Sequence, residues 1–172
     1  LDLSYKRLQF TPEILPGGYT IINRETGKTE YRPGAALCNL FLADEINRTS
    51  SKTQSALLEA MEEGSITVDG TTHIIPRPYT VIATQNPIGS TGTQLLPESQ
   101  MDRFIIKISI GYPSINDEVR ILKQKQGQNP LDNVGKVADK NDIIEMQKSV
   151  ENIYISDEVY EYIARLAAAT RN

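Results

Sequence analysis

The sequence predicts an α/β fold, in which a parallel sheet carries two inserted hairpins and a small helical region follows. Short apolar runs of strand length alternate with helical patterns up to residue 110, which is typical of a sheet with helices packed against it. Residues 36–45 form a continuous apolar run that ends in two adjacent carboxylates, as expected of a buried parallel strand. Beyond Pro113 the composition becomes helical and polar.

The composition of the 172 residues is that of a globular domain. Hydrophobic residues make up 39% and charged residues 23%, and the net charge of −4 gives no reason to expect a nucleic acid or a membrane surface as partner. The single Cys38 excludes a disulfide framework within one chain and favours a buried thiol in a reducing compartment. No apolar segment approaches the length of a membrane span and no signal sequence is evident, so we expect a cytoplasmic protein. Because the chain begins at Leu1 and stops directly after an apolar helical pattern, we expect it to be a piece of a longer protein.

The first part of the chain predicts a strand, a single helical turn and a hairpin. Residues 5–10 form a short strand candidate, and residues 11–16 have the N-cap and proline of a capped turn. Residues 19–23 and 29–32 flank a loop in which Gly27 can take the positive φ that a hairpin needs.

The middle part predicts a helix followed by a second hairpin. Residues 49–51 offer three possible N-caps for a helix that ends at Gly64. Residues 65–68 and 71–75 are joined by Asp69-Gly70, a strong hairpin signal. On this hairpin the lone histidine is expected to be an ordinary strand residue.

Two more strands and four helices complete the prediction. Residues 79–84 form a second buried strand, and a short helix over residues 98–104 leads to a strand over residues 105–110. The polar end of the chain is predicted to hold three helices, over residues 116–125, 140–149 and 156–170.

Two predicted strands end in polar residues that suit phosphate chemistry. Asp44 and Glu45 end the first, and because adjacent residues of a strand point in opposite directions, they cannot perform the same task. One could hold Mg²⁺ while the other orients a water molecule. If the two strands are neighbours, Asn86 can hold the attacking water or a terminal phosphate oxygen while Glu45 polarises that water. The alternative is that the two acids merely end a strand and cap the next turn.

In the order of these segments the chain resembles the AAA+ ATPases, and most closely their MoxR family. The matching segments are a Walker B stretch, the helix after it, a sensor 1 stretch and two short motifs, at residues 40–48, 52–63, 81–87, 96–98 and 102–104. Residues 6–12 and 107–113 also look like that family. Magnesium chelatase subunits and dynein-like and midasin-like ATPases share the acid pair and the amide, but Asn47-Arg48 and residues 52–54 favour MoxR.

The resemblance implies a partial AAA+ core over residues 1–113 and the start of a helical lid domain over residues 114–172. It implies ATP and Mg²⁺ as cofactors. Asp44 would contact Mg²⁺, Glu45 would be the general base, and Asn86 would be the sensor 1 residue that, with these acids, binds the nucleotide.

The same resemblance implies contacts between subunits of a hexameric ring. Arg103 would be an arginine finger that reaches the nucleotide of the next subunit, with Arg48 as a second candidate for a contact between subunits. The alternative for Arg103 is a salt bridge to Glu98 or Asp102.

The resemblance also implies partners. The hairpins match the helix 2 insert and the pre-sensor 1 insert, which are thought to transmit the nucleotide state to a client. The parent protein would remodel or mature client protein complexes, with a von Willebrand factor A-type protein as a further candidate partner. A different hypothesis is a non-catalytic protein-interaction module derived from an AAA+ core.

The sequence holds no G-x-x-x-x-G-K-[ST] phosphate-binding loop, and no sensor 2 arginine can be matched. We therefore expect these residues alone to bind ATP weakly or not at all and to be inactive. In AAA+ proteins the strand before that loop lies between the sensor 1 strand and the one predicted at residues 105–110. Its loss from the sheet leads us to expect an altered sheet, an exchange of strands between chains, or a poorly ordered C-terminal half.

Overall fold

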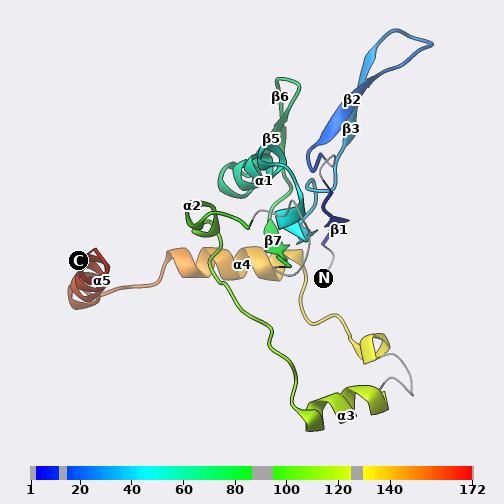
Figure 1. Ribbon diagram of the computed structural model, residues 1–172. Coiled ribbons are helices and arrows are strands. Elements are labelled where there is room, and N and C mark those ends of the chain that lie inside the picture. Colours follow the sequence, from blue (N-terminus) through cyan, green and yellow to red (C-terminus); the bar gives the residue numbers. More distant parts are fainter. Residues whose placement is uncertain (1–2, 12–14, 87–94, 125–129, 172) are drawn as a thin grey trace. The chain divides into compact units, whose positions relative to one another are not determined.

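The computed structural model describes residues 3–11, 15–86, 95–124 and 130–171 (Figure 1). Contacts between residues divide the chain into two compact units, Leu1–Val137 and Ala138–Asn172. The helical turn predicted at residues 11–16 depends on residues 12–14, which lie outside the described residues.

A three-stranded parallel sheet organises the first unit. Its strands are β1 (Tyr5–Gln9), β4 (Leu40–Asp44) and β7 (Thr80–Ala83), in the order β1-β4-β7. The register places Gln9 opposite Asp44. Because all three strands run in the same direction, their carboxyl ends lie at one edge of the sheet, and the two strands that end in polar residues are neighbours as predicted.

The hydrophobic core lies under one face of β4. Phe41 and Ala43 are fully buried, whereas the alternate residues Leu40 and Leu42 are half-buried, so the strand buries one face more completely than the other. The Phe41 ring meets the Phe10 ring edge to face, with 6.4 Å between centroids. The buried members of this core are Phe10, Ala36, Cys38, Phe41, Ala43, Ile46, Leu57 and Leu96.

Helix α1 (Ser51–Glu63) covers this core and confirms the predicted helix. Of the three possible N-caps it uses Ser50, whose hydroxyl oxygen accepts a 3.3 Å hydrogen bond from the Thr53 N–H. It ends at Gly64, which has φ +64°, a left-handed conformation that glycine adopts without steric cost. Leu57 is fully buried on its inward face.

Both predicted hairpins are present. The first consists of β2 (Gly18–Ile22) and β3 (Thr29–Pro33), and the second of β5 (Ser65–Val68) and β6 (Thr71–Ile74). In the second, Asp69 and Gly70 both have positive φ, 47° and 78°, as the tightest hairpin turn requires.

Side-chain contacts join the two hairpins to each other. The Tyr31 ring stacks on the His73 ring, with centroids 3.7 Å apart and planes at 9°. The Thr20 hydroxyl donates a hydrogen bond to Asp69, and β2 contacts β5. His73 lies in β6 as predicted, and its ring in addition contacts Tyr31 of the other hairpin.

Two predicted strands differ from the structure. Residues 36–39 are bent rather than extended, so β4 begins only at Leu40. Residues 105–110 form no strand at all, and Ile105 and Ile110 are 99% and 93% exposed. A strand needs a neighbour for its backbone N–H and C=O groups, and within the described residues no strand pairs with this segment. This agrees with an altered sheet, one of the three outcomes expected.

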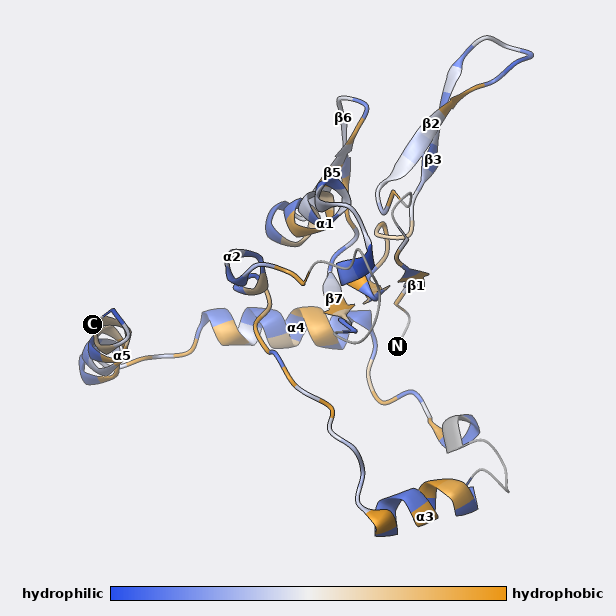
Figure 2. Ribbon diagram, viewed as in Figure 1, coloured by the Kyte–Doolittle hydropathy of each residue, from blue (hydrophilic) through white to orange (hydrophobic). Residues whose placement is uncertain are grey.

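The remaining helices are α2 (Glu98–Met101), α3 (Ile115–Gln124), α4 (Lys140–Glu151) and α5 (Asp157–Ala169), with a 3-10 turn at Pro130–Asn133. The Ser114 hydroxyl oxygen precedes α3 and accepts a hydrogen bond from the Asp117 N–H at 3.2 Å. Apolar and hydrophilic residues share the surfaces of α3 and α4 (Figure 2). Among the described residues no helix is both long and apolar enough to cross a bilayer.

Candidate active site

The ends of β4 and β7 are joined through the Thr84 hydroxyl. That hydroxyl donates a 2.5 Å hydrogen bond to Asp44 Oδ1 and accepts one of 2.9 Å from the Glu45 N–H. The backbone pairing continues beyond the strands, because the Ile46 N–H donates to the Thr84 carbonyl at 3.0 Å. The two acids predicted for the site are thus held at the tip of the neighbouring strand.

Asp44 is kept as a carboxylate by its surroundings. The hydrogen bond from Thr84 and the ion pair with Arg7, which comes from β1, hold the pKa of Asp44 below its ordinary value of 3.8. An ionised carboxylate beside a hydroxyl is the oxygen-rich chemistry that Mg²⁺ prefers.

Glu45 has a strained backbone, with φ +56° and ψ +46° in the left-handed region. Its Oε2 atom accepts hydrogen bonds from Arg48 Nη1 at 2.8 Å and from Gln9 Nε2 at 3.1 Å. These bonds, with Arg48 as the largest cause, lower the pKa of Glu45, and hydrogen bonding from the Asn86 side chain adds to the effect. Arg48, a candidate for a contact between subunits, therefore has a partner within its own chain.

The structure brings Glu45 and Asn86 together, as the sequence analysis expected. It also shows a residue that sequence reasoning passed over, namely Asn47. The Asn47 side chain donates from Nδ2 to the Asn86 carbonyl at 3.0 Å and accepts at Oδ1 from the Asn86 N–H at 3.2 Å. A signal was available, because Asn47 is a polar residue next to the apolar Ile46, close behind a buried strand.

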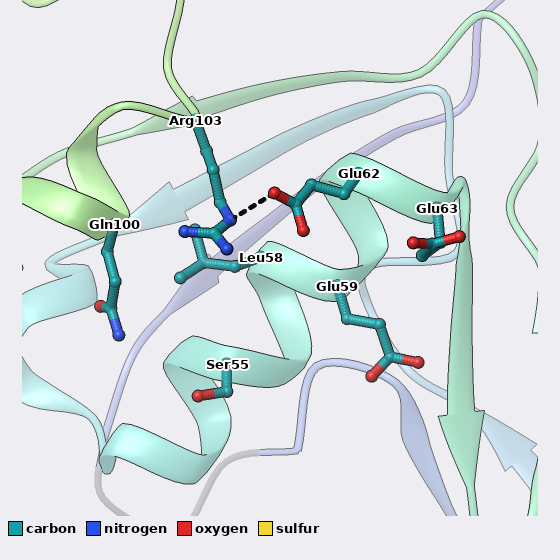
Figure 3. Close-up of a pocket in the computed structure, with 7 residues that line it drawn as sticks. All are labelled: Ser55, Leu58, Glu59, Glu62, Glu63, Gln100 and Arg103. Atoms are coloured by element: carbon teal, nitrogen blue, oxygen red, sulfur yellow. Dashed lines mark ion pairs between the residues drawn. The ribbon is translucent and has the colours of Figure 1, made fainter.

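Arg103 lies beside a shallow hollow on α1. The hollow of about 220 Å³ is lined by Ser55, Leu58, Glu59, Glu62, Glu63, Gln100 and Arg103 (Figure 3). Arg103 Nε pairs with Glu62 Oε1 at 2.7 Å, and Nη1 donates to the Ser99 carbonyl at 2.8 Å. The described ion pair therefore goes to Glu62 rather than to Glu98 or Asp102, the partners weighed from the sequence.

The residues at the strand ends can supply one of the ligands of Mg²⁺, with phosphate oxygens and water as the others. The described residues contain no group of three or more acidic, histidine or cysteine side chains that could hold a metal alone. One carboxylate combined with phosphate oxygens and water is the usual arrangement for Mg²⁺ at a nucleotide. Asp44 suits that role, because it is ionised and adjoins the Thr84 hydroxyl.

Comparisons with known proteins show the family of this chain. The model of the ATPase family associated with various cellular activities (AAA) matches residues 1–106. The chain is 37% identical to Chaperone MoxR1 of Mycobacterium tuberculosis, over 98% of the chain and 45% of that protein. It is 27% identical to Protein MoxR of Methylorubrum extorquens, over 64% of the chain and 34% of that protein. The chain belongs to the MoxR family of AAA+ ATPases.

Further similarities of this MoxR-family chain cover nearly all of it. It is 49% identical to the uncharacterized protein YeaC of Bacillus subtilis, over 99% of the chain and 54% of YeaC. The crystal structure of a "putative ATPase" from Cytophaga hutchinsonii matches with a TM-score of 0.83 and 39% identity, over 99% of this chain and 52% of that one. The MoxR-family chain spans about half the length of the curated relatives it matches.

Proposed function

We propose that this chain supplies the water-activating part of the ATP hydrolysis site in a MoxR-type AAA+ ATPase. The observation that carries the proposal is the meeting of Glu45 with the Asn86 side chain at the ends of adjacent strands. A carboxylate and an amide that are neighbours can act on one water molecule.

In the proposed mechanism each residue has one task. Asp44 holds Mg²⁺, which when bound neutralises charge on the phosphates. The Glu45 carboxylate accepts a proton from the attacking water, and Asn86 orients that water or a terminal phosphate oxygen. Because Arg48 and Gln9 lower the pKa of Glu45, they weaken it as a base, so these two bonds must loosen for efficient hydrolysis.

We assign Arg103 the role of arginine finger for the next subunit of a hexameric ring. The support comes from the partners of its side chain. Glu62 and Ser99 belong to α1 and α2, so the described contacts do not tie Arg103 to Asp44 of its own chain. A guanidinium held by two groups on one side keeps further N–H donors for a partner subunit's phosphate.

The work of the whole protein is proposed to be the remodelling or maturation of client protein complexes. The similarity to a protein named as a chaperone supports this proposal, as does the joined pair of hairpins, which can act on a client as one unit. A von Willebrand factor A-type protein is a candidate partner.

The 172 residues contain no phosphate-binding loop, so the groups that bind the phosphates are proposed to come from residues outside them. This stretch alone should therefore bind ATP weakly and hydrolyse none.

The experiment is the substitution Glu45→Gln in the full-length protein. Turnover of ATP should fall by about 100-fold or more, because the base is lost, while nucleotide affinity changes little. Glu25→Gln is the matched control, since Glu25 is an exposed glutamate in the loop between β2 and β3. Unchanged turnover in the Glu45 variant would contradict the role given to Glu45, whereas a wild-type protein that hydrolyses no ATP would favour the non-catalytic interaction module.

A further inference from the structure

Asn47 is a buried side chain that bonds only to another residue's backbone in the described contacts. It lies in the 3-10 turn Ile46–Arg48 and is 1% exposed. Its amide forms two complementary hydrogen bonds with the main chain of Asn86, one to the carbonyl and one from the N–H. Two bonds to the same residue fix both the position and the orientation of the Asn86 peptide groups.

The turn that carries Asn47 is itself tied to Glu45. The Arg48 N–H donates to the Glu45 carbonyl at 2.9 Å, and the buried Gln54 side chain donates to the Ile46 carbonyl at 3.3 Å. The Glu45 backbone is therefore held at one end of a short rigid turn, and Asn47 projects from the same turn. A shift of Asn47 changes the separation between the Glu45 and Asn86 side chains.

We propose that Asn47 is a positioning residue that sets the Asn86 side chain against the Glu45 carboxylate. It acts through the backbone of Asn86 and has no contact of its own with the reacting atoms. The inference rests on the proposed function, because it assumes that Glu45 and Asn86 act on one water molecule. A loss of this bridge lets the Asn86 backbone move by a fraction of an ångström or more, a displacement to which hydrolysis is sensitive.

Asn39 provides a matched control from the other end of β4. It is also a buried asparagine, 6% exposed, and it directly precedes Leu40, the first residue of β4. Its Nδ2 donates to the carbonyls of Pro78 and Pro76 at 2.9 and 3.3 Å, and its Oδ1 accepts from Ser4. Asn39→Ala thus removes a comparable buried amide and a similar set of hydrogen bonds without touching the site.

The test compares Asn47→Ala, Asn39→Ala and Glu45→Gln in the full-length protein. Hydrogen–deuterium exchange of the Asn86 amide should become roughly fivefold faster or more in Asn47→Ala, the change that one ordinary hydrogen bond implies, and should not change in Asn39→Ala. The kcat for ATP should fall on the order of 10- to 100-fold in Asn47→Ala with KM nearly constant, whereas Asn39→Ala should lower Tm and leave kcat within about threefold.

The outcomes separate this inference from the function it rests on. If Glu45→Gln abolishes turnover but Asn47→Ala keeps the wild-type kcat, the positioning role is wrong and the proposed function stands. Equal losses of kcat in the two asparagine variants would also overturn the positioning role, because they would indicate a general effect of stability. If Glu45→Gln keeps full turnover, the proposed function fails and the positioning role fails with it.

Discussion

The Gln9 side chain donates a 3.1 Å hydrogen bond to the Glu45 carboxylate, although the two residues are 36 positions apart in the chain. The parallel pairing of β1 with β4 places them together, since Gln9 lies opposite Asp44 in the register. Arg48 donates to the same carboxylate oxygen, Oε2, at 2.8 Å. These two hydrogen bonds lower the pKa of the proposed base, so we expect hydrolysis to be faster when they loosen.

Removing the Arg48 restraint should change the pH dependence of hydrolysis. Hydrogen bonds from Arg48 and Gln9 lower the pKa of Glu45 below 4.5, so Arg48→Ala lets that pKa rise. The acidic limb of the kcat/KM profile in the full-length protein should then move to higher pH. Arg120→Ala is the control, because Arg120 makes an exposed pair with Asp117 at the same three-residue spacing on α3. A profile that stays in place in Arg48→Ala would mean that another group sets the acidic limb.

Stability should fall in acid in a way that depends on Arg7. The folded-state pKa of Asp44 lies below its ordinary value, so Asp44 contributes stability above about pH 4 and loses it as the pH falls through the lowered pKa. Arg7→Ala brings the pKa of Asp44 in the folded state closer to its pKa in the unfolded state. The decline of the unfolding free energy between about pH 5 and pH 2 should therefore become flatter. Urea unfolding at several pH values measures this, and parallel curves for wild type and variant would refute the account.

The two hairpins should be energetically coupled. A double-mutant cycle with Tyr31→Ala and His73→Ala should give a coupling of about 1 kcal/mol in unfolding free energy, because the rings stack at 3.7 Å. Tyr19→Ala with His73→Ala is the matched cycle, since Tyr19 is an exposed tyrosine on β2 of the same hairpin. Coupling near zero in the first cycle would show that the hairpins are energetically independent.

Gly64 should tolerate no side chain without cost. Its φ of +64° ends α1, and a left-handed residue with a Cβ costs about 1 kcal/mol or more. Gly64→Ala should therefore lower the unfolding free energy by that amount. Gly111→Ala should be nearly neutral, because Gly111 does not need positive φ and nothing lies within 4 Å of the added Cβ. Equal losses of unfolding free energy in Gly64→Ala and Gly111→Ala would show that the left-handed conformation of Gly64 at the end of α1 is not the cause.

The elements that the sequence predicted well are those with local signals. Gly27, the Asp69-Gly70 pair and Gly64 each mark a turn or a helix end through their own backbone preferences, and the structure places turns or ends at all of them. The acids at the tip of β4 were also found locally, because a carboxylate pair after an apolar run stands out.

The features that the sequence did not predict depend on distant partners. A local search for the partner of Arg103 considered Glu98 and Asp102, whereas the described partner Glu62 belongs to α1, far earlier in the chain. The segment over residues 105–110 has strand propensity but no neighbouring strand in the described residues, and pairing rather than propensity decides whether a strand forms. The polar Asn47 beside Ile46 was visible in the sequence, but its partner was not, because its two hydrogen bonds go to the backbone of Asn86, 39 positions away.

The most direct test of the account is a double-mutant cycle on Glu45 and Asn86 in the full-length protein, measured as kcat for ATP. If the carboxylate and the amide act on one water molecule, Asn86→Ala should cost on the order of 100-fold alone but less than about tenfold when Glu45 is already Gln. If the fold-loss of kcat in the double variant equals the product of the losses in the two single variants, the two side chains act independently. That result would contradict the account.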